Sequence, residues 1–214
     1  MTDPIPLSST LSEPRNPAHV ERKQVLRKFF LFFVALTAVT VLSAQPDPPL
    51  TWKAKVAQAM PLLGHRNWIL IVDSAYPLQS SPGVETIETD AHLLEVVQFV
   101  LEEMNASIHV RPLIYMDSEL PFVPDEDAPG ASNYRRQIGD LLHNYPVASL
   151  PHDTIISNID QAGKQFQVLV LKTRMTIPYS SVFIRLDCKY WSGEAEKRMR
   201  AKMNAAQSAR PPAQ

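Results

Sequence analysis

Residues 63–77 have the sequence LGHRNWILIVDSAYP, and this stretch decides the fold that we predict. Its centre, from Trp68 to Val72, is a continuous apolar run of the kind that forms a strand buried on both faces of a sheet. His65 precedes this run and Asp73 ends it. Ligands of open α/β sheets bind at the carboxyl ends of the strands, so His65 and Asp73 could face one small polar ligand. The alternative interpretation is that Asp73 only forms a turn and that His65 lies on a loop surface.

Strands and helices are predicted to alternate along the rest of the domain. Apolar periodicity predicts helices over 52–63, 91–104, 134–145 and 153–162, and strands over 107–116, 147–150, 166–171 and 179–186. We expect Asp90 to cap the second helix and residues 77–88 to form a loop. The last two strands are close enough in sequence to pair antiparallel. The alternation predicts a single α/β domain, layered, with a mainly parallel sheet flanked by helices.

The composition suits one globular domain with extensions. Of the 214 residues, 45% are hydrophobic and 20% are charged. The net charge of −1 provides no basic footprint for nucleic acid, so no nucleic-acid partner is expected. The single cysteine, Cys188, excludes an internal disulfide and a zinc site built from several cysteines.

The N-terminal part of the chain predicts export. Residues 1–21 are rich in Pro, Ser and Asn and are expected to be disordered. Residues 22–44 join a basic cluster to a charge-free run from Phe29 to Ala44, the pattern of a signal peptide or a short membrane anchor. A buried core helix is the alternative interpretation of this run. With either kind of export signal, the domain would be periplasmic or extracellular and would contact the membrane only through its N-terminal segment.

The remaining residues divide into a linker, a domain and a tail. Residues 45–50 are expected to form a proline-rich linker, and residues 51–192 the globular domain. Residues 193–214 are expected to start as a solvated helix and to fade into a disordered, charged, Pro/Ala-rich tail.

Several motifs in this order resemble those of the D-ribose pyranase and L-fucose mutarotase family. That family carries Gly-His after a helix and then a strand that ends in Asp-Ala with a proline nearby. The counterparts here are Gly64-His65 and the segment from Asp73 to Pro77. The family's acid before a leucine-rich helix corresponds to Asp90–Val97, and its late apolar strand and Tyr-x-Asn motif correspond to Val168–Leu171 and Tyr179–Ser181.

The resemblance implies a cofactor-free isomerase that interconverts anomers or ring forms of a monosaccharide. It also implies assembly into rings of identical chains, with the sugar site near subunit contacts, and no metal. His65 and Asp73 would be the catalytic residues. A histidine that titrates near neutral pH suits the proton transfers of hemiacetal ring opening, and Asp73 can hold sugar hydroxyls or orient the imidazole.

The resemblance further implies a set of residues that bind the substrate. His152 matches a second histidine of the ribose-type members, and Tyr179 can hydrogen-bond the sugar and cover its apolar face. The full set of expected substrate-binding residues is Asp90, His152, Arg174, Tyr179 and Ser181.

Three departures from the family pattern support an alternative function. The family's Asp two residues after the histidine is Asn67 here, its Asn after the tyrosine is Ser181, and its Gly-Glu pair is replaced by Lys172-Thr173. A site built to hydrogen-bond a hydroxyl discriminates strongly when one partner is missing. The alternative is therefore a non-catalytic, exported module of the same fold that binds monosaccharides or mediates assembly.

Two other site chemistries are disfavoured by residue spacing. His65, Asp73, Asp90 and His92 are potential metal ligands, but they show no tight ligand spacing such as His-x-x-x-His. A phosphotransfer site at Asp73 would require a second acid two residues later, where the chain has Ala75.

Overall fold

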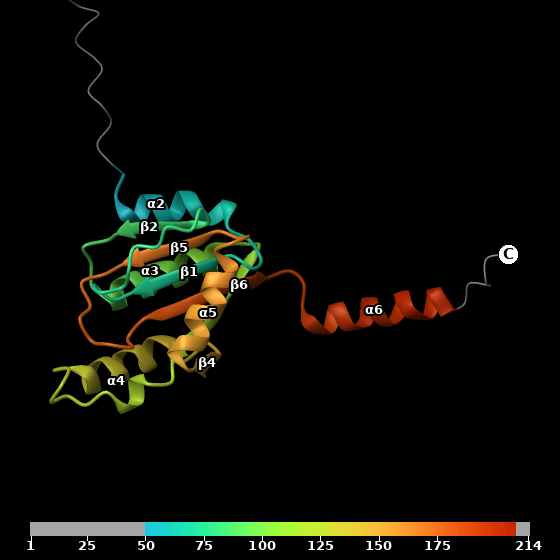
Figure 1. The fold of residues 1–214 in the computed structure, drawn as a ribbon. Coiled ribbons are helices and arrows are strands. Elements are labelled where there is room, and N and C mark those ends of the chain that lie inside the picture. The colour runs from blue at the N-terminus through green and yellow to red at the C-terminus, as the bar shows by residue number, and fades with distance from the viewer. Residues whose placement is uncertain (1–49, 209–214) are drawn as a thin grey trace, which may run out of the picture. The chain divides into compact units, whose positions relative to one another are not determined.

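The computed structural model describes residues 50–208, which form one α/β domain around a six-stranded sheet (Figure 1). The strand order is β2–β5–β1–β6–β3–β4. The strands are β1 (Trp68–Val72), β2 (Val84–Glu88), β3 (Val110–Asp117), β4 (Val147–Leu150), β5 (Val168–Lys172) and β6 (Val182–Cys188). Neighbouring strands are parallel in the pairs β2–β5, β5–β1 and β3–β4, and β6 runs antiparallel to both β1 and β3. The predicted class, a layered and mainly parallel sheet flanked by helices, is confirmed.

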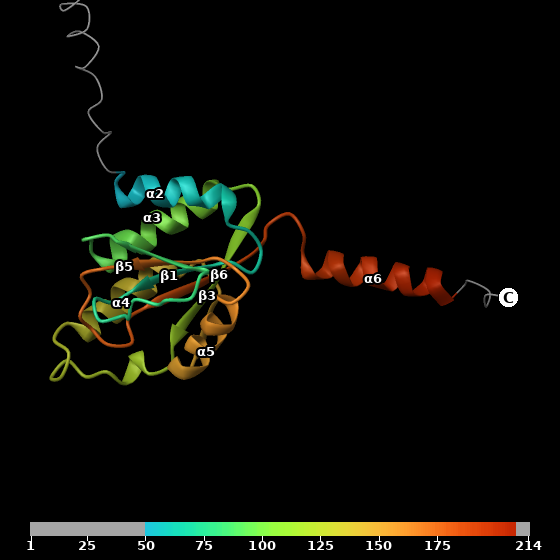
Figure 2. The ribbon, with the colours of Figure 1, turned by 45° about the horizontal axis from the view of Figure 1, so that its top comes forward.

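Helices cover both faces of the sheet. The α-helices are α2 (Trp52–Ala59), α3 (Leu93–Ala106), α4 (Ala131–Leu142), α5 (His152–Ala162) and α6 (Gly193–Ser208), and two short 3₁₀ helices are η1 (Met60–Leu62) and η2 (Leu120–Phe122). The apolar sides of α2, α3 and α4 join the core on one face of the sheet, and that of α5 joins the core on the other. In Figure 2, α2 and α3 lie together on one side of the sheet and α5 lies on the other.

Strand β1 lies inside the sheet, and all five of its residues are buried. Because side chains alternate across a strand, Ile69 and Ile71 enter the core beside α3. Trp68, Leu70 and Val72 enter the core beside α5. The continuous apolar run in the sequence therefore follows from a strand with a core on each face.

The predicted loop over residues 77–88 is wrong, because its second half forms β2. Only Ile87 of this strand is buried, and two of its five residues are glutamates, so its sequence lacks the apolar run of an inner strand. Hydrogen bonds to β5 hold it at the edge of the sheet, where exposed charges protect against further pairing. Gly83, directly before β2, allows the chain to come close to residues 163–166. A Cβ at this position would collide with the backbone carbonyls of Gly163 and Phe166.

The expected antiparallel pairing of the last two strands is also wrong, because β1 lies between β5 and β6. The connection between these strands, residues 173–181, crosses the carboxyl end of β1. Thr173 bonds to the carbonyl of Val72 through its N–H (3.0 Å) and its hydroxyl (2.7 Å). The N–H of Ser74 donates in turn to the carbonyl of Met175 (2.8 Å). This crossing connection, hereafter the 173–181 loop, brings late residues of the chain to Asp73.

The structure bears on only some of the predictions for the two ends of the chain. The predictions for residues 1–49, including the export segment at 22–44, fall outside the described residues. At the other end, the expected solvated helix is present as α6, none of whose residues is buried. Within residues 50–208, no helix combines the length and apolarity needed to cross a membrane.

Candidate functional site

Five polar and aromatic residues meet where β1 and β3 end, at the carboxyl edge of the sheet. Asp73 follows β1, Asp117 ends β3, and His152 begins α5. Tyr179 and Ser181 belong to the 173–181 loop, which crosses the same edge. We call Asp73, Asp117, His152, Tyr179 and Ser181 the carboxyl-edge cluster. Four of its members were predicted from the sequence as site residues, and the structure brings these four together.

Asp73 is oriented by three hydrogen bonds. The hydroxyl of Ser181 donates to its Oδ2 (3.2 Å), and the N–H of Ala75 donates to its Oδ1 (2.9 Å). The N–H of Asp73 in turn donates to the Ser181 hydroxyl (3.4 Å). The carboxylate is thus held in place while it stays partly accessible, and each oxygen still has a lone pair for a ligand hydroxyl.

His152 and Asp117 form a hydrogen-bonded pair, with 3.1 Å between the imidazole Nδ1 and the carboxylate Oδ1. The Asp117 side chain is fully buried, whereas 37% of the His152 side chain is exposed. The second Asp117 oxygen, Oδ2, is buried and has no hydrogen-bond partner among the described residues. Burial raises the pKa of Asp117 to about 6, although the nearby His152 opposes the rise. Asp117 therefore titrates close to neutral pH.

Neighbouring groups fix the position of His152. Its backbone N–H donates to both carboxylate oxygens of Glu119 (3.0 and 3.2 Å), and this bond holds the pKa of Glu119 below its usual range. The Glu119 side chain thus caps α5, whose own N-cap residue, Pro151, has no capping side chain. The ring of Tyr179 contacts that of His152 edge-on, with 5.6 Å between the centroids.

Tyr179 sits on strained backbone. Its φ of 58° lies in the left-handed region, which is uncommon for a bulky residue, and 40% of the residue is exposed. The loop around it is held by buried bonds: the hydroxyl of Tyr134 donates to the carbonyl of Ser180, and the hydroxyl of Ser180 donates to that of Ile177 (2.6 Å). Strain of this kind concentrates at binding sites, where the surroundings enforce it.

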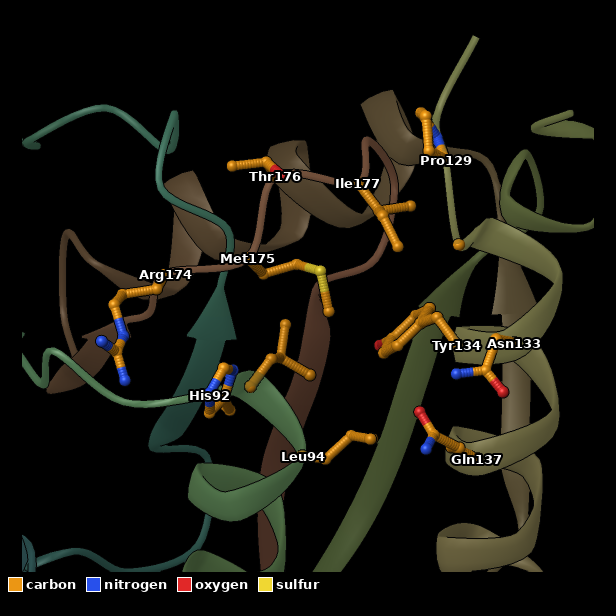
Figure 3. Close-up of a pocket in the computed structure, with 12 residues that line it drawn as sticks. His92, Leu94, Pro129, Asn133, Tyr134, Gln137, Arg174, Met175, Thr176 and Ile177 are labelled. Atoms are coloured by element: carbon orange, nitrogen blue, oxygen red, sulfur yellow. The ribbon is translucent and has the colours of Figure 1, made fainter. Parts of the chain in front are cut away.

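Arg174 lines a separate hollow on the α3–α4 side of the 173–181 loop, and Asp90 lies beside Arg174. Figure 3 shows Arg174 and His92 on one side of this hollow, with Asn133, Tyr134 and Gln137 across from them. Its volume is about 420 Å³. Arg174 Nε lies 3.5 Å from Asp90 Oδ1, but both side chains are largely exposed. Arg174 therefore lines a surface hollow and Asp90 lies next to it, and neither predicted site residue belongs to the carboxyl-edge cluster.

The predicted capping role of Asp90 is wrong. Helix α3 begins at Leu93, and its N-cap is His92, which makes no side-chain capping bond. Asp90 has a φ of 49°, and its N–H donates to the side chain of Glu88 (3.1 Å). The residue therefore turns the chain between β2 and α3 before the helix starts.

His65 lies at the opposite edge of the sheet, before the amino end of β1. Its Nδ1 is 3.1 Å from Asp187 Oδ1, and 55% of its side chain is exposed. Arg111 binds the other oxygen of Asp187 through Nε (2.9 Å) and Nη2 (2.6 Å). Partial burial opposes ionisation of Asp187, but the hydrogen bonds from Arg111, the Cys188 backbone and His65, together with the charge of Arg111, outweigh it and hold the pKa of Asp187 below its usual range. We call His65, Arg111 and Asp187 the amino-edge cluster.

The structure does not bring His65 and Asp73 together within one chain. They flank β1, whose five residues span roughly 16 Å at about 3.3 Å per residue. Asn67, which stands where the family pattern has Asp, has a structural role at the same edge. Asn67 accepts from the N–H of Gly64 (2.7 Å) and donates to the carbonyl of Gln167 (3.1 Å), so it ties the turn before β1 to the start of β5.

Asp117 is the site residue that our sequence reasoning missed, because it lies directly after the strand predicted over residues 107–116 and was given no role. A signal was present in the sequence, since Asp117 follows an apolar strand, as Asp73 does.

Among residues 50–208, no group of three or more His, Cys, Asp or Glu side chains is placed to hold a metal ion.

Comparisons with known proteins found similarity only among solved structures. No protein-family model matches the chain, and no curated protein does. Bacillus subtilis RbsD, solved in complex with D-ribose, is 15% identical with a TM-score of 0.45, and the match covers 65% of this chain and 96% of that one. Fucose mutarotase from Streptococcus pneumoniae, in complex with L-fucose, is 18% identical with a TM-score of 0.41, covering 67% and 96%. FucU from Bifidobacterium longum is 16% identical with a TM-score of 0.43, covering 64% and 92%.

Proposed function

We propose that the carboxyl-edge cluster binds a monosaccharide and interconverts its anomers or ring forms without a cofactor. The observation that carries this proposal is the hydrogen bond between His152, which is partly exposed, and Asp117, which is buried. A buried carboxylate with one unsatisfied oxygen is unfavourable for stability, and such groups concentrate at functional sites.

The pair provides the acid–base chemistry that ring opening needs. A base removes the proton of the anomeric hydroxyl, and an acid protonates the ring oxygen as the carbon–oxygen bond breaks. When Asp117 is ionised, it accepts the Nδ1 proton of His152 and leaves Nε2 free to take a proton from the sugar. Asp117 thereby selects the tautomer and fixes the orientation of the ring.

The other cluster members suit recognition of a sugar. The oriented carboxylate of Asp73 can accept hydrogen bonds from hydroxyl groups, and the Ser181 hydroxyl beside it can exchange donor and acceptor roles. The exposed ring of Tyr179 offers an apolar surface to the carbon-bound hydrogens of a pyranose or furanose.

His65 fits this mechanism only in an assembly. Within one chain it lies at the amino edge, so a site with both histidines requires the amino edge of one copy to meet the carboxyl edge of another. The predicted ring of identical chains would allow this contact, and His65 of the neighbouring copy would then be the second proton-transfer group.

Saturation-transfer NMR on the full chain tests the proposal, with ribose, fucose and other common monosaccharides as substrates. We expect anomer exchange above the buffer rate with at least one sugar, and its loss in His152→Ala. Thr154→Ala, at an exposed position on the same helix but outside the cluster, is the matched control and should retain exchange. If sugars bind but none exchanges faster than in buffer, the isomerase proposal fails and the non-catalytic binding module is supported. This chain has Ser181 where the family pattern has Asn, and this replacement favours the second function.

Export remains a proposal that rests on residues 22–44. Mass spectrometry of the protein recovered from its native cell should find a mature chain that starts near Gln45, or an intact chain in the membrane fraction. A full-length chain in the soluble cytoplasmic fraction would contradict export.

A further inference from the structure

A second hollow, on the α5 side of the sheet, contains two arginines that take no part in the carboxyl-edge cluster. Its volume is about 430 Å³. Arg66 precedes β1, and Arg185 lies on β6 opposite Trp68. Trp68 and Tyr115 line the same hollow, and three carboxamides add polar lining from α5 and the turn after it: Asn158, Gln161 and Gln165.

Neither arginine has a counter-ion in the part of the chain that the structure describes. No carboxylate of residues 50–208 lies within 4.0 Å of the guanidinium nitrogens of Arg66 or Arg185. The lining of the hollow contains no Asp or Glu. Asp187, two residues beyond Arg185, is engaged by Arg111 and His65. Two positive charges therefore share one hollow without neutralisation.

The backbone fixes the origin of both side chains. Arg185 belongs to a strand that is hydrogen-bonded to β1 on one side and to β3 on the other. Arg66 has a φ of 78°, in the left-handed region, and its N–H donates to the carbonyl of Leu186 (3.0 Å). Its guanidinium carbon lies 5.7 Å from the centroid of the Phe166 ring. A non-glycine residue held in this region is strained, and such strain concentrates at functional positions.

We propose that this hollow binds the phosphate group of a phosphorylated small molecule. One arginine can satisfy a carboxylate by binding its two oxygens, whereas a phosphate monoester has three free oxygens and a charge between −1 and −2, which matches two guanidinium groups. The carboxamides of Asn158, Gln161 and Gln165 supply additional donors. Trp68 and Tyr115, whose ring centroids are 5.5 Å apart, form an apolar wall for the organic part of the ligand.

Calorimetric titration of the full chain at constant ionic strength tests this proposal, with inorganic phosphate and glucose 6-phosphate as probes and glucose as the control. We expect both phosphates to bind and glucose not to bind at this site. Arg66→Gln and Arg185→Gln should each weaken phosphate binding by about tenfold or more, since each removes charge-assisted hydrogen bonds. Tighter binding of the ester than of phosphate would identify a phosphorylated metabolite as the ligand, and equal binding would identify free phosphate.

Matched variants separate this site from general charge effects and from the proposed sugar site. Arg198→Gln removes the same charge from an exposed position on α6 and should bind phosphate like the wild type. His152→Ala should also retain phosphate binding. Arg66→Gly relieves the left-handed strain, so it should fold at least as stably as the wild type and still lose binding. The proposal is overturned if the wild type binds neither phosphate, or if Arg185→Gln and Arg66→Gly bind as tightly as the wild type.

Discussion

The two edges of the sheet hold two histidine–carboxylate pairs with the same separation and opposite electrostatics. His152 lies 3.1 Å from Asp117 at the carboxyl edge, and His65 lies 3.1 Å from Asp187 at the amino edge. The carboxylate of Asp117 is fully buried, and one of its oxygens has no partner among residues 50–208. The carboxylate of Asp187 is 20% exposed, and Arg111 binds its second oxygen.

This difference decides the pH range in which each carboxylate gains or loses its proton. Burial raises the pKa of Asp117 to about 6, so its proton is exchangeable in the range where acid–base catalysts work. Partial burial also disfavours the charge on Asp187, but Arg111, the Cys188 backbone and His65 together keep its pKa low, so the group stays ionised. A short histidine–carboxylate distance therefore does not identify a catalytic pair; the burial and the remaining partners of the carboxylate do.

The largest expected effect concerns catalysis and tests whether the two edges cooperate. His152→Ala and His65→Ala should each lower the enzyme-dependent rate of anomer exchange by about 10²- to 10⁴-fold, the usual contribution of a proton-transfer group. Because a shared site needs one intact histidine from each of two copies, a mixture of the two inactive variants should recover part of the activity. Saturation-transfer NMR on the mixed, refolded variants measures this recovery. Full activity of His65→Ala would remove the amino edge from the mechanism.

The next effect is a pH dependence of stability that belongs to Asp117 alone. Its pKa is about 6 in the folded chain, against the ordinary value of 3.8 that an unfolded chain retains. The folded state binds this proton more tightly, so the stabilising contribution is complete below pH 3.8 and is lost as the pH rises through 6. Relative to Asp117→Asn, the wild type should lose about 2–3 kcal/mol of unfolding free energy between about pH 4 and pH 7. Urea denaturation across this range measures the difference, and parallel curves for the two proteins would refute it.

Local sequence patterns predicted most of the fold, because periodicity and apolar runs depend on neighbouring residues. The five buried residues of β1 and the apolar side of α5 were recognisable in this way. Strand β2 was missed since its stability comes from a partner about 80 residues away, in β5, and its own sequence is mostly polar. The position of β1 between β5 and β6 depends on the path of the 173–181 loop, which no local pattern encodes.

The candidate site was predictable in part for the same reason. The resemblance singled out Asp73, His152, Tyr179 and Ser181, and the structure places them in one cluster, although their roles remain predictions. The separation of His65 from Asp73 could have been predicted, since a five-residue strand between them spans roughly 16 Å. The burial of Asp117 could not, because it depends on α5, whose first residue His152 comes 35 positions later in the chain and contacts Asp117.

A smaller effect concerns sugar affinity and again contrasts the two edges. Asp73→Ala removes a carboxylate that is already oriented for hydroxyl groups, so the affinity for the preferred sugar should fall by about tenfold or more. Asp187→Ala removes a carboxylate of the amino-edge cluster and should change the affinity by less than about threefold. Titration calorimetry of both variants measures these effects. If Asp187→Ala weakens sugar binding as much as Asp73→Ala, the sugar does not bind at the carboxyl edge of a single chain.

The smallest expected effect is the loss of stability in His65→Ala. The imidazole is 55% exposed, and its partner Asp187 keeps two bonds from Arg111, so no buried charge is left unpaired. Exposed pairs of this kind contribute about 0–1 kcal/mol, and we expect a change below about 0.5 kcal/mol in unfolding free energy by urea denaturation. Arg111→Ala is the matched control and should cost more, because it leaves a partly buried carboxylate with only a weak partner. A loss near 2 kcal/mol in His65→Ala would show that this histidine is structural, and its effect on exchange would then need no catalytic explanation.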